Sequence, residues 1–441
     1  NFEYRNYIRK CVENGETDYK KMRHASKVQE KYAQHAANLL GDEDSYKRQL
    51  GKMKRKKFGG TEIIPPEYQK LKVFDTYLQE LKDVQFYYRK DDLEYFLIPD
   101  LLHELNGNIS ADGTYHAVKN QPNSRQVYCI TKQMFSNGGK KTHCQPIVCV
   151  LLPNQQQATY EKMWDHLKEL YLHYTGGVLA PTVIHSDNEM AFLNACEKKF
   201  PNARRLTCVY HIADNINRHL KTAGFALNNL DCPWMVREQY HIIIALLYTN
   251  VRDPEQLGFA MKVLDNIENN AYMYLQDEPL EKFKGWVQYV KNTWFSARSA
   301  HFIGKNSNFY EDIQLQETPQ LTNNPCEVLN RVMKNSFHVG YILKSTMAST
   351  LRDYFSQKYI DYTVFLNGDK NRNRSKDVLL KMKRLKVITY ALQHLMPTLP
   401  IEEKGKLFNE SVYKLAHITA PNIEHLFWLN FPQQAPYIIF E

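Results

Sequence analysis

Between residues 108 and 152 the hydrophobic pattern changes to short extended runs, and this change constrains the fold more than any other feature of the chain. The runs are rich in Val, Ile, Tyr and Cys, and groups of turn-forming residues separate them. Successive strands joined by short turns pair antiparallel, so the pattern predicts a three-stranded meander. The three runs are residues 108–118, 125–135 and 142–152.

Helices alternate with strands after this meander. Residues 158–174 carry apolar side chains at intervals of three and four residues, the stripe of an amphipathic helix. The order β-β-β-α-β-α-β-α describes a mixed sheet flanked by helices and matches the ribonuclease H-like fold. We therefore expect an α/β protein with a ribonuclease H-like mixed sheet. The later units are a strand at 181–184, a helix at 190–200, a strand at 206–210 and a helix at 212–222.

The chain is basic, with a formal net charge of +9 over 441 residues. This balance favours polyanionic partners but does not distinguish nucleic acid from an acidic protein surface. The densest block, residues 47–57, holds seven Lys and Arg residues and no acidic residue. Such a block is a solvated face, a nuclear localisation signal or a set of phosphate contacts. The phosphate-contact candidates are Lys52, Lys54, Arg55, Lys56 and Lys57.

The eight cysteines form no Cys-x-x-Cys pair, and several lie in strand-like runs where a buried, reduced thiol is ordinary. We therefore expect a reducing compartment. No run approaches the ~20 apolar residues of a membrane span, so we expect no membrane partner.

Three short acidic segments are the candidates for chemistry. Asp112 and Asp187 each end a strand-like run, and Glu327 opens a helix. If the two strands are neighbours, both aspartates lie side by side, and a helix packed on the sheet brings the glutamate to them. Magnesium prefers such oxygen ligands, and two divalent ions about 3.5–4 Å apart are a common arrangement for phosphodiester cleavage.

Each aspartate has an alternative interpretation. Asp112 precedes Gly113, and an Asp-Gly pair is typical of a turn. Asp187 has a close rival in Glu189, and an aspartate at this position is also a preferred cap for the helix that follows.

The glutamate has rivals upstream, Glu311 and Glu317. Asn324 before Glu327, and Arg331 one turn after it, favour Glu327 over these two.

Several segments, in their order and spacing from about residue 47 to residue 337, resemble the transposase of Mutator-like elements. The segments are Ala111-Asp112-Gly113-Thr114-Tyr115, Gln126-Val127-Tyr128, Leu151-Leu152-Pro153-Asn154 with Thr159-Tyr160, Asp187, Cys208-Val209-Tyr210-His211, and Thr322-Asn323-Asn324 with Glu327.

This resemblance implies a nuclear DDE-type DNA recombinase. Such an enzyme binds the terminal inverted repeats of the element, hydrolyses the ends and joins the freed 3′ hydroxyls to target DNA, with two magnesium or manganese ions per active site. It implies that Asp112, Asp187 and Glu327 are the catalytic metal ligands. Because two transposon ends must be held together, we expect a homodimer or higher oligomer on double-stranded DNA.

Cys208 and His211 match the Cys-x-x-His signature of that family. One interpretation is half of a zinc site, which needs four ligands and would have to recruit His185 or His219. The other is a buried cysteine with a histidine that orients Asp187 or a phosphate. We expect the second, with Cys208, His211 and Asn324 supporting the catalytic residues.

Further DNA contacts are predicted in the helical part of the chain. Insertions of related transposases offer an aromatic residue that stacks on an extruded base, and Trp294 is the candidate, although core packing is the alternative for any single Trp. Arg298 and Arg331 are candidate DNA contacts.

These signals divide the chain into five parts. The parts are a helical basic region for DNA binding and dimerisation at 1–100, a sheet domain in two parts at 101–222 and 320–366, an all-α insertion at 223–319, and a basic helical region at 367–441.

Two other functions fit the same fold. A structure-specific nuclease would act on junctions or on RNA/DNA hybrids, and a domesticated DNA-binding regulator would have lost cleavage. Loss of one of the three carboxylates would mark the regulator, and all three are present.

Overall fold

The computed structural model describes the chain from residue 64 to residue 419 with gaps. The described residues are 64, 66–75, 80–115, 124–136, 141–306, 326–327, 329–331, 333, 344–366 and 376–419. The basic block at 47–57, with Lys52, Lys54, Arg55, Lys56 and Lys57, lies outside them, as do Asn324, Glu311 and Glu317.

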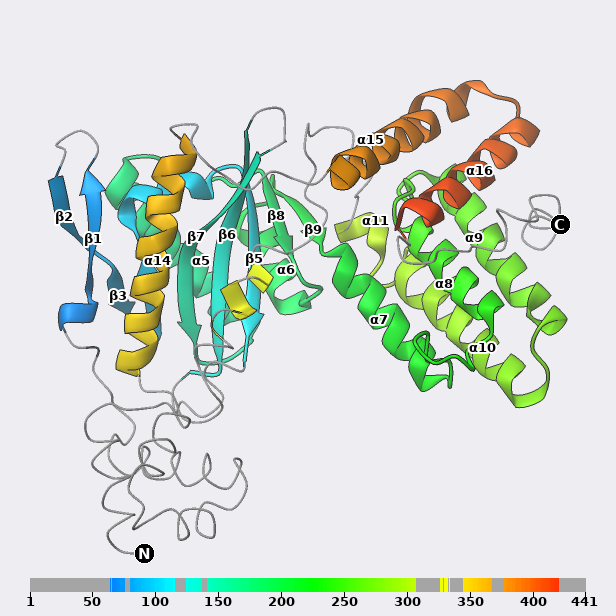
Figure 1. The fold of residues 1–441 in the computed structure, drawn as a ribbon, viewed down its shortest axis with the longest axis horizontal. Helices are drawn as coiled ribbons and strands as arrows, with labels where there is room; N and C mark the ends of the chain where they lie inside the picture. The colour runs from blue at the N-terminus through cyan, green and yellow to red at the C-terminus, as the bar shows by residue number, and fades with distance from the viewer. Residues whose placement is uncertain are drawn as a thin grey trace, which may run out of the picture.

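A seven-stranded mixed sheet forms the larger core, in the order β3-β4-β7-β6-β5-β8-β9 (Figure 1). The predicted meander is confirmed, because β5 and β7 both pair antiparallel with β6. β8 then adds parallel to β5, and β9 adds parallel to β8. The bounds are β5 Asn108–Thr114, β6 Gln126–Ser136, β7 Lys141–Leu152, β8 Val183–Ser186 and β9 Arg204–Thr207.

The expectation of helix up to residue 100 is wrong for four segments between residues 70 and 97, which form strands. β1 (Lys70–Asp75) and β2 (Glu80–Gln85) make a two-stranded sheet, while β3 (Tyr87–Lys90) and β4 (Leu93–Leu97) extend the main sheet beyond β7. All five residues of β4 are buried. A short run that is buried throughout has no period that separates strand from helix, so its pairing with β3 and β7 decides the conformation.

Helices cover both faces of the main sheet. Figure 1 shows α14 (Lys344–Leu366) on the near face, whereas α5 (Gln157–Thr175) and α6 (Met190–Lys199) lie behind the sheet. The helix predicted at 158–174 is confirmed as α5, and Gly176 caps it with φ of 68°, a left-handed conformation that glycine adopts without strain.

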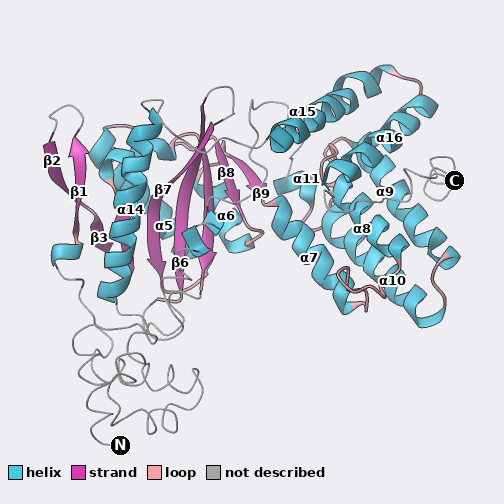
Figure 2. Cartoon of the chain, viewed as in Figure 1, coloured by secondary structure: helices cyan, strands magenta, loops and turns pink. Residues whose placement is uncertain are grey.

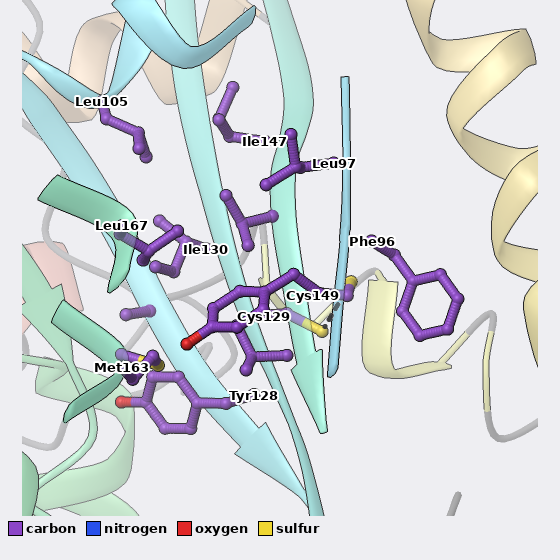
Figure 3. Close-up of a cluster of buried hydrophobic side chains, with 14 of the residues drawn as sticks. Phe96, Leu97, Leu105, Tyr128, Cys129, Ile130, Ile147, Cys149, Met163 and Leu167 are labelled. Atoms are coloured by element: carbon purple, nitrogen blue, oxygen red, sulfur yellow. Dashed lines mark hydrogen bonds between the residues drawn. The ribbon is translucent and has the colours of Figure 1, made fainter. Parts of the chain in front are cut away.

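Side chains of β6 alternate between these two layers (Figure 3). The ring of Tyr128 packs edge-on against Tyr160 of α5, with centroids 5.2 Å apart. The next residue, Cys129, lies opposite Cys149 of β7 with a sulfur–sulfur distance of 3.3 Å. The Tyr128 face of the sheet therefore packs on α5, while the Cys129 face, which also carries Phe96, forms the opposite layer of the core.

A second, helical lobe surrounds its own hydrophobic core (Figure 2). The prediction that the insertion is helical is confirmed for its described residues. Asp253 caps α9 and accepts a hydrogen bond from the backbone N–H of Glu255, and Pro254 is the first helical residue. The lobe contains α7 Val209–Thr222, α8 Trp234–Leu246, α9 Pro254–Asn269, α10 Asp277–Val290, α15 Lys376–Tyr390 and α16 Ile401–Thr419.

Two boundaries differ from the expected division. α7 begins at Val209 and packs in the core of the helical lobe, although it was assigned to the sheet domain. α15 and α16 also pack into that core and form no separate C-terminal region, because Phe408 contacts Phe259 with ring centroids 5.5 Å apart.

Short irregular helical segments complete the described structure. They are η2 Pro66–Tyr68, η3 Pro99–Leu105, η4 Asn270–Met273, η5 Lys291–Phe295, α11 Ile303–Asn306, η6 Ala391–Leu395 and η7 Met396–Thr398. No helix in the described part of the chain has an apolar stretch of the length that a bilayer span requires.

We predict that Lys344→Met destabilises the protein by about 3–5 kcal/mol, because it leaves the Glu94 carboxylate buried without its cation. Lys344 and Glu94 join α14 to β4, and their side chains are only 9% and 8% exposed. Urea denaturation measures the change.

The matched control is Lys282→Met, which removes an exposed ion pair within α10 and is expected to cost less than about 1 kcal/mol. Equal effects of the two substitutions would contradict the structural role of the buried pair.

Candidate active site

Asp112 and Asp187 lie at matching levels of two neighbouring parallel strands. Ser110 of β5 is paired with His185 of β8, and each aspartate follows its member of that pair by two residues. Residues two apart along a strand point to the same face of the sheet. The predicted side-by-side placement of the two carboxylates therefore follows from the register of β5 and β8.

Asp112 is inside β5 and not in a turn, so the turn interpretation of Asp112-Gly113 is wrong. A Cβ at Gly113 would lie 2.3 Å from Gln126 Nε2, so the Gln126 side chain would have to shift to admit it. The Asp112 carboxylate is 6% exposed, and Asn330 Nδ2 donates to its Oδ2 at 2.9 Å. Burial raises the pKa of Asp112 well above its ordinary value, and the charge of Asp187 raises it further.

Asp187 follows β8 directly and does not cap the next helix. The residue at the cap of α6 is Glu189, with no side-chain capping bond. Asp187 Oδ1 is shielded from solvent and has no hydrogen-bond partner among the described residues. Burial raises the pKa of Asp187 to about 7, and the charge of Glu189 contributes in the same direction.

Glu189, the sequence rival of Asp187, is held by neutral donors. Tyr160 donates to its Oε1 at 2.6 Å, and Gln155 Nε2 donates to the same oxygen at 3.3 Å. Glu189 is therefore restrained on the α5 side, whereas the nearby Asp187 retains a carboxylate oxygen that no donor satisfies.

Glu327 is placed by the residue before it. Cys326 is fully buried on β6, where its sulfur lies 3.2 Å from Thr131 Oγ1 and 3.5 Å from the carbonyl oxygen of Cys129. Glu327 and Asn330 lie three apart in the helical segment 326–333, so both side chains share one helix face. Asn330 contacts Asp112, and the charge of Glu327 contributes to the raised pKa of Asp112.

Cys208 and His211 come to the same place from the helical lobe. Cys208 directly follows β9 and is the N-cap of α7, so the strand expected at 206–210 ends at Thr207 instead, and His211 lies in the first turn of α7. A sulfur, a ring nitrogen and a carboxylate oxygen of Cys208, His211 and Glu327 all lie within 4.8 Å of one another. Burial lowers the pKa of His211, and the charge of Glu327 partly opposes this shift.

The predicted recruits for a zinc site are placed elsewhere. His185 is fully buried between β5 and β9, and burial, aided by the charge of Arg204, lowers its pKa to about 3. His219 stacks on Tyr289 with ring centroids 3.8 Å apart.

The donor set of the carboxylates fits a hard divalent cation. Asp187 Oδ1 and Glu327 Oε1 are both shielded from solvent without a hydrogen-bond partner in the described structure. Burying carboxylates near one another is costly unless a cation offsets the repulsion. Oxygen ligands of this kind are those that Mg²⁺ and Mn²⁺ prefer.

Residues 109–215 match the family model of the MULE transposase domain. The chain carries a MULE transposase domain. The match extends from β5 into α7, so it contains Asp112, Asp187, Cys208 and His211. No curated protein matches the chain.

The MULE transposase domain ends before the predicted DNA contacts of the insertion, and one of these is wrong. Trp294 is 3% exposed and belongs to the core of the helical lobe. An aromatic ring that stacks on a base must expose a face, so core packing is the correct interpretation. Arg298 and Arg331 are both exposed, which leaves their side chains accessible to a phosphate backbone.

Sequence reasoning missed Asn330 and the pair that restrains Glu189. Asn330 lies three residues after Glu327, and this spacing was a usable signal. Tyr160 and Gln155 carried no such signal, because their contacts with Glu189 depend on how α5 packs beside the MULE domain sheet.

We predict that Asp187→Asn raises the melting temperature of the metal-free protein at pH 8 by several degrees. A folded-state pKa of about 7, above the ordinary 3.8, means that folding favours the neutral acid. This contribution is fully present below the ordinary pKa and is lost as pH rises through the folded-state pKa. The gain from Asn should therefore grow between about pH 4 and pH 7.

Thermal denaturation in a chelator, scanned over this pH range, measures the gain. The exposed Asp231 supplies the control, since Asp231→Asn should show no such pH dependence. A gain for Asp187→Asn that stays constant from pH 4 to pH 8 would show that Asp187 is not a strained, buried acid.

Proposed function

We propose that the protein is a DDE-type, cut-and-paste DNA transposase that binds terminal inverted repeats, cleaves the transposon ends and joins the 3′ hydroxyls to target DNA. The observation that carries this proposal is the convergence of Asp112, Asp187 and Glu327 on one MULE transposase domain. Two of the three acids lie within the matched segment, and the third reaches them through a helix that docks on β6.

We propose further that the sheet is ribonuclease H-like. Its central part has three antiparallel strands followed by two parallel ones, in the order β7-β6-β5-β8-β9. Asp112 is on the central β5, and Asp187 follows the adjacent β8. This arrangement supports the fold assignment, because the carboxylates come from neighbouring strands in the sheet.

Asp112, Asp187 and Glu327 would hold two Mg²⁺ or Mn²⁺ ions. Such ions, when bound, activate a water or hydroxyl nucleophile and stabilise the leaving oxygen. The protein's own contribution is to preorganise this site. Asn330 fixes the orientation of Asp112 through its hydrogen bond to Oδ2, and burial of both aspartates keeps water from competing for their oxygens.

DNA is the proposed partner because the chain is basic and because it matches the MULE transposase domain. The net charge of +9 favours a polyanion, and Arg331 is exposed on the helix that carries Glu327. Joining two ends in one reaction requires a dimer or larger assembly, and nuclear location follows from a DNA substrate.

We predict that Asp112→Ala, Asp187→Ala and Glu327→Gln each lower magnesium-dependent cleavage of labelled end DNA by about 1,000-fold or more. Each removes a carboxylate that the other two do not replace. Glu311→Gln, at the sequence rival of Glu327, is the control and should retain cleavage. Unchanged cutting by any of the first three variants would remove that residue from the proposed site.

Strand transfer should be lost together with cleavage in this assay. Transfer products from a labelled terminal repeat distinguish a transposase from a nuclease that acts on junctions or on RNA/DNA hybrids. Cleavage without transfer to target DNA would favour the nuclease.

We also predict different outcomes for two adjacent residues of one helix. Asn330→Ala should raise the Mg²⁺ concentration for half-maximal cleavage by about 10–100-fold, because Asp112 loses the donor that orients it. Arg331→Ala should weaken DNA binding and reduce the slope of log binding constant against log salt concentration by about one, with an unchanged Mg²⁺ requirement. An unchanged metal requirement in Asn330→Ala would contradict its positioning role.

A further inference from the structure

The Cys208, His211 and Glu327 cluster combines three different donor atoms in one place. Cys208 caps α7 and His211 lies three residues later in its first turn, so both side chains gather at one end of the helix. Glu327 comes from the helical segment that docks on the sheet. His211 Nε2 lies 3.9 Å from Glu327 Oε1, and donor atoms of all three residues lie within 4.8 Å of one another.

Two polar atoms of this cluster have no partner in the described part of the chain. His211 Nδ1 and Glu327 Oε1 are both shielded from solvent and make no hydrogen bond with any described residue. The separation of His211 Nε2 from Glu327 Oε1 is also too long for a hydrogen bond. Because a shielded polar atom without a partner is costly, Glu327 Oε1 indicates a ligand at this cluster, and His211 Nε2 lies 3.9 Å from that oxygen, within reach of the same ligand.

The donor types identify the ligand as a borderline-soft transition-metal ion. A thiolate disfavours Mg²⁺ and Ca²⁺, whereas sulfur, imidazole nitrogen and carboxylate oxygen are the ligands of Zn²⁺. Bonds of about 2.0–2.3 Å place two donors of one zinc ion less than about 4.6 Å apart. The observed 3.9 Å lies within that reach. Three protein ligands leave a fourth position for water.

We propose that Cys208, His211 and Glu327 form a zinc site, and that zinc bound there excludes magnesium from the neighbouring carboxylates because both sites need Glu327. The second part rests on the proposed function. Glu327 lies between the two sites, since its Oε1 is 3.9 Å from His211 Nε2, and Asn330, three residues later on the same helix face, donates to Asp112 Oδ2 at 2.9 Å. Zinc and magnesium are then alternative ligands of one glutamate.

The zinc site requires a third ligand that the spacing of residues in the sequence did not reveal. The Cys-x-x-His pair has no second pair at matching spacing, so it supplies only half of a four-ligand site. The fold supplies a carboxylate as the third ligand from a residue far along the chain. Because a carboxylate serves as the third ligand, the lack of a second Cys/His pair in the sequence no longer argues against a zinc site.

Cobalt spectroscopy on the whole protein without DNA tests the site directly. We expect one equivalent of Co²⁺ to bind with a sulfur-to-cobalt charge-transfer band in the near ultraviolet. Cys208→Ser should abolish the band. His211→Asn should weaken cobalt and zinc binding by more than about 100-fold, because loss of a residue that only hydrogen-bonds to a metal ligand already costs about 10–100-fold. Cys232→Ser, at a buried cysteine of the helical lobe, is the matched control and should keep the band.

The absence of a thiolate band in the wild-type protein, or a band that survives Cys208→Ser, would overturn the site. Far-ultraviolet circular dichroism of each variant shows whether it is folded. If Cys208→Ser does not fold, His211→Asn and Glu327→Gln decide the question, because retention of full cobalt affinity by both would overturn the proposal.

Competition between metals tests the shared glutamate. Millimolar Mg²⁺ should lower the apparent Co²⁺ affinity of the wild-type protein at least severalfold, and by linkage Co²⁺ should lower its Mg²⁺ affinity equally. This effect should disappear in the Asp112→Asn, Asp187→Asn double variant, which cannot bind magnesium beside Glu327. An unchanged Co²⁺ affinity in Mg²⁺ would overturn mutual exclusion.

A cleavage assay separates this inference from the proposed function. Micromolar Zn²⁺ should inhibit magnesium-dependent cleavage of end DNA, and the ratio of activities with and without zinc should move toward one in Cys208→Ser. If no metal supports cleavage, the proposed function fails while the cobalt band still tests the zinc site. If cleavage proceeds but the band is absent, the zinc site fails alone.

Discussion

The parallel pairing of β5 with β8 is the constraint on which the candidate site depends. It sets the register that places Asp112 and Asp187 at one level and on one face of the sheet. A slip of one residue would turn one carboxylate to the opposite face. The buried side chains on both faces of the sheet, including Ile109 and Ile184 in these two strands, resist such a slip because it would disrupt their close packing.

Burial of several carboxyl groups near one another makes their charged forms unfavourable in this region. The neutral forms of Asp112 and Asp187 are favoured, since their pKa values are raised chiefly by burial and then by neighbouring carboxylates. The rest of the fold keeps them in place through Cys326, which docks its helix on β6, and through Asn330, which bonds Asp112. A divalent cation would convert this repulsion into attraction.

Much of the sheet domain was predictable from local pattern. The meander, α5 with its glycine stop and the insertion helices have strong periods or clear turn residues, and the structure has them all. Prediction failed where a short run had no period. Strand β4 is buried over its whole length, and the short strand expected at 206–210 ends at Thr207, with Cys208 as the cap of α7. Trp294 failed for another reason, because exposure is a property of packing and not of residue type.

By itself the sequence determined the order of strands and helices from residue 108 onward and named the three acids, because periodicity, turn residues and motif spacing act over short distances along the chain. Only the tertiary structure decided which atoms meet. The contact of Asn330 with Asp112 and the cluster of Glu327 with Cys208 and His211 join residues more than a hundred positions apart. Such contacts follow from how helices dock on the sheet, and that docking is set by the summed burial of many side chains that no local pattern contains.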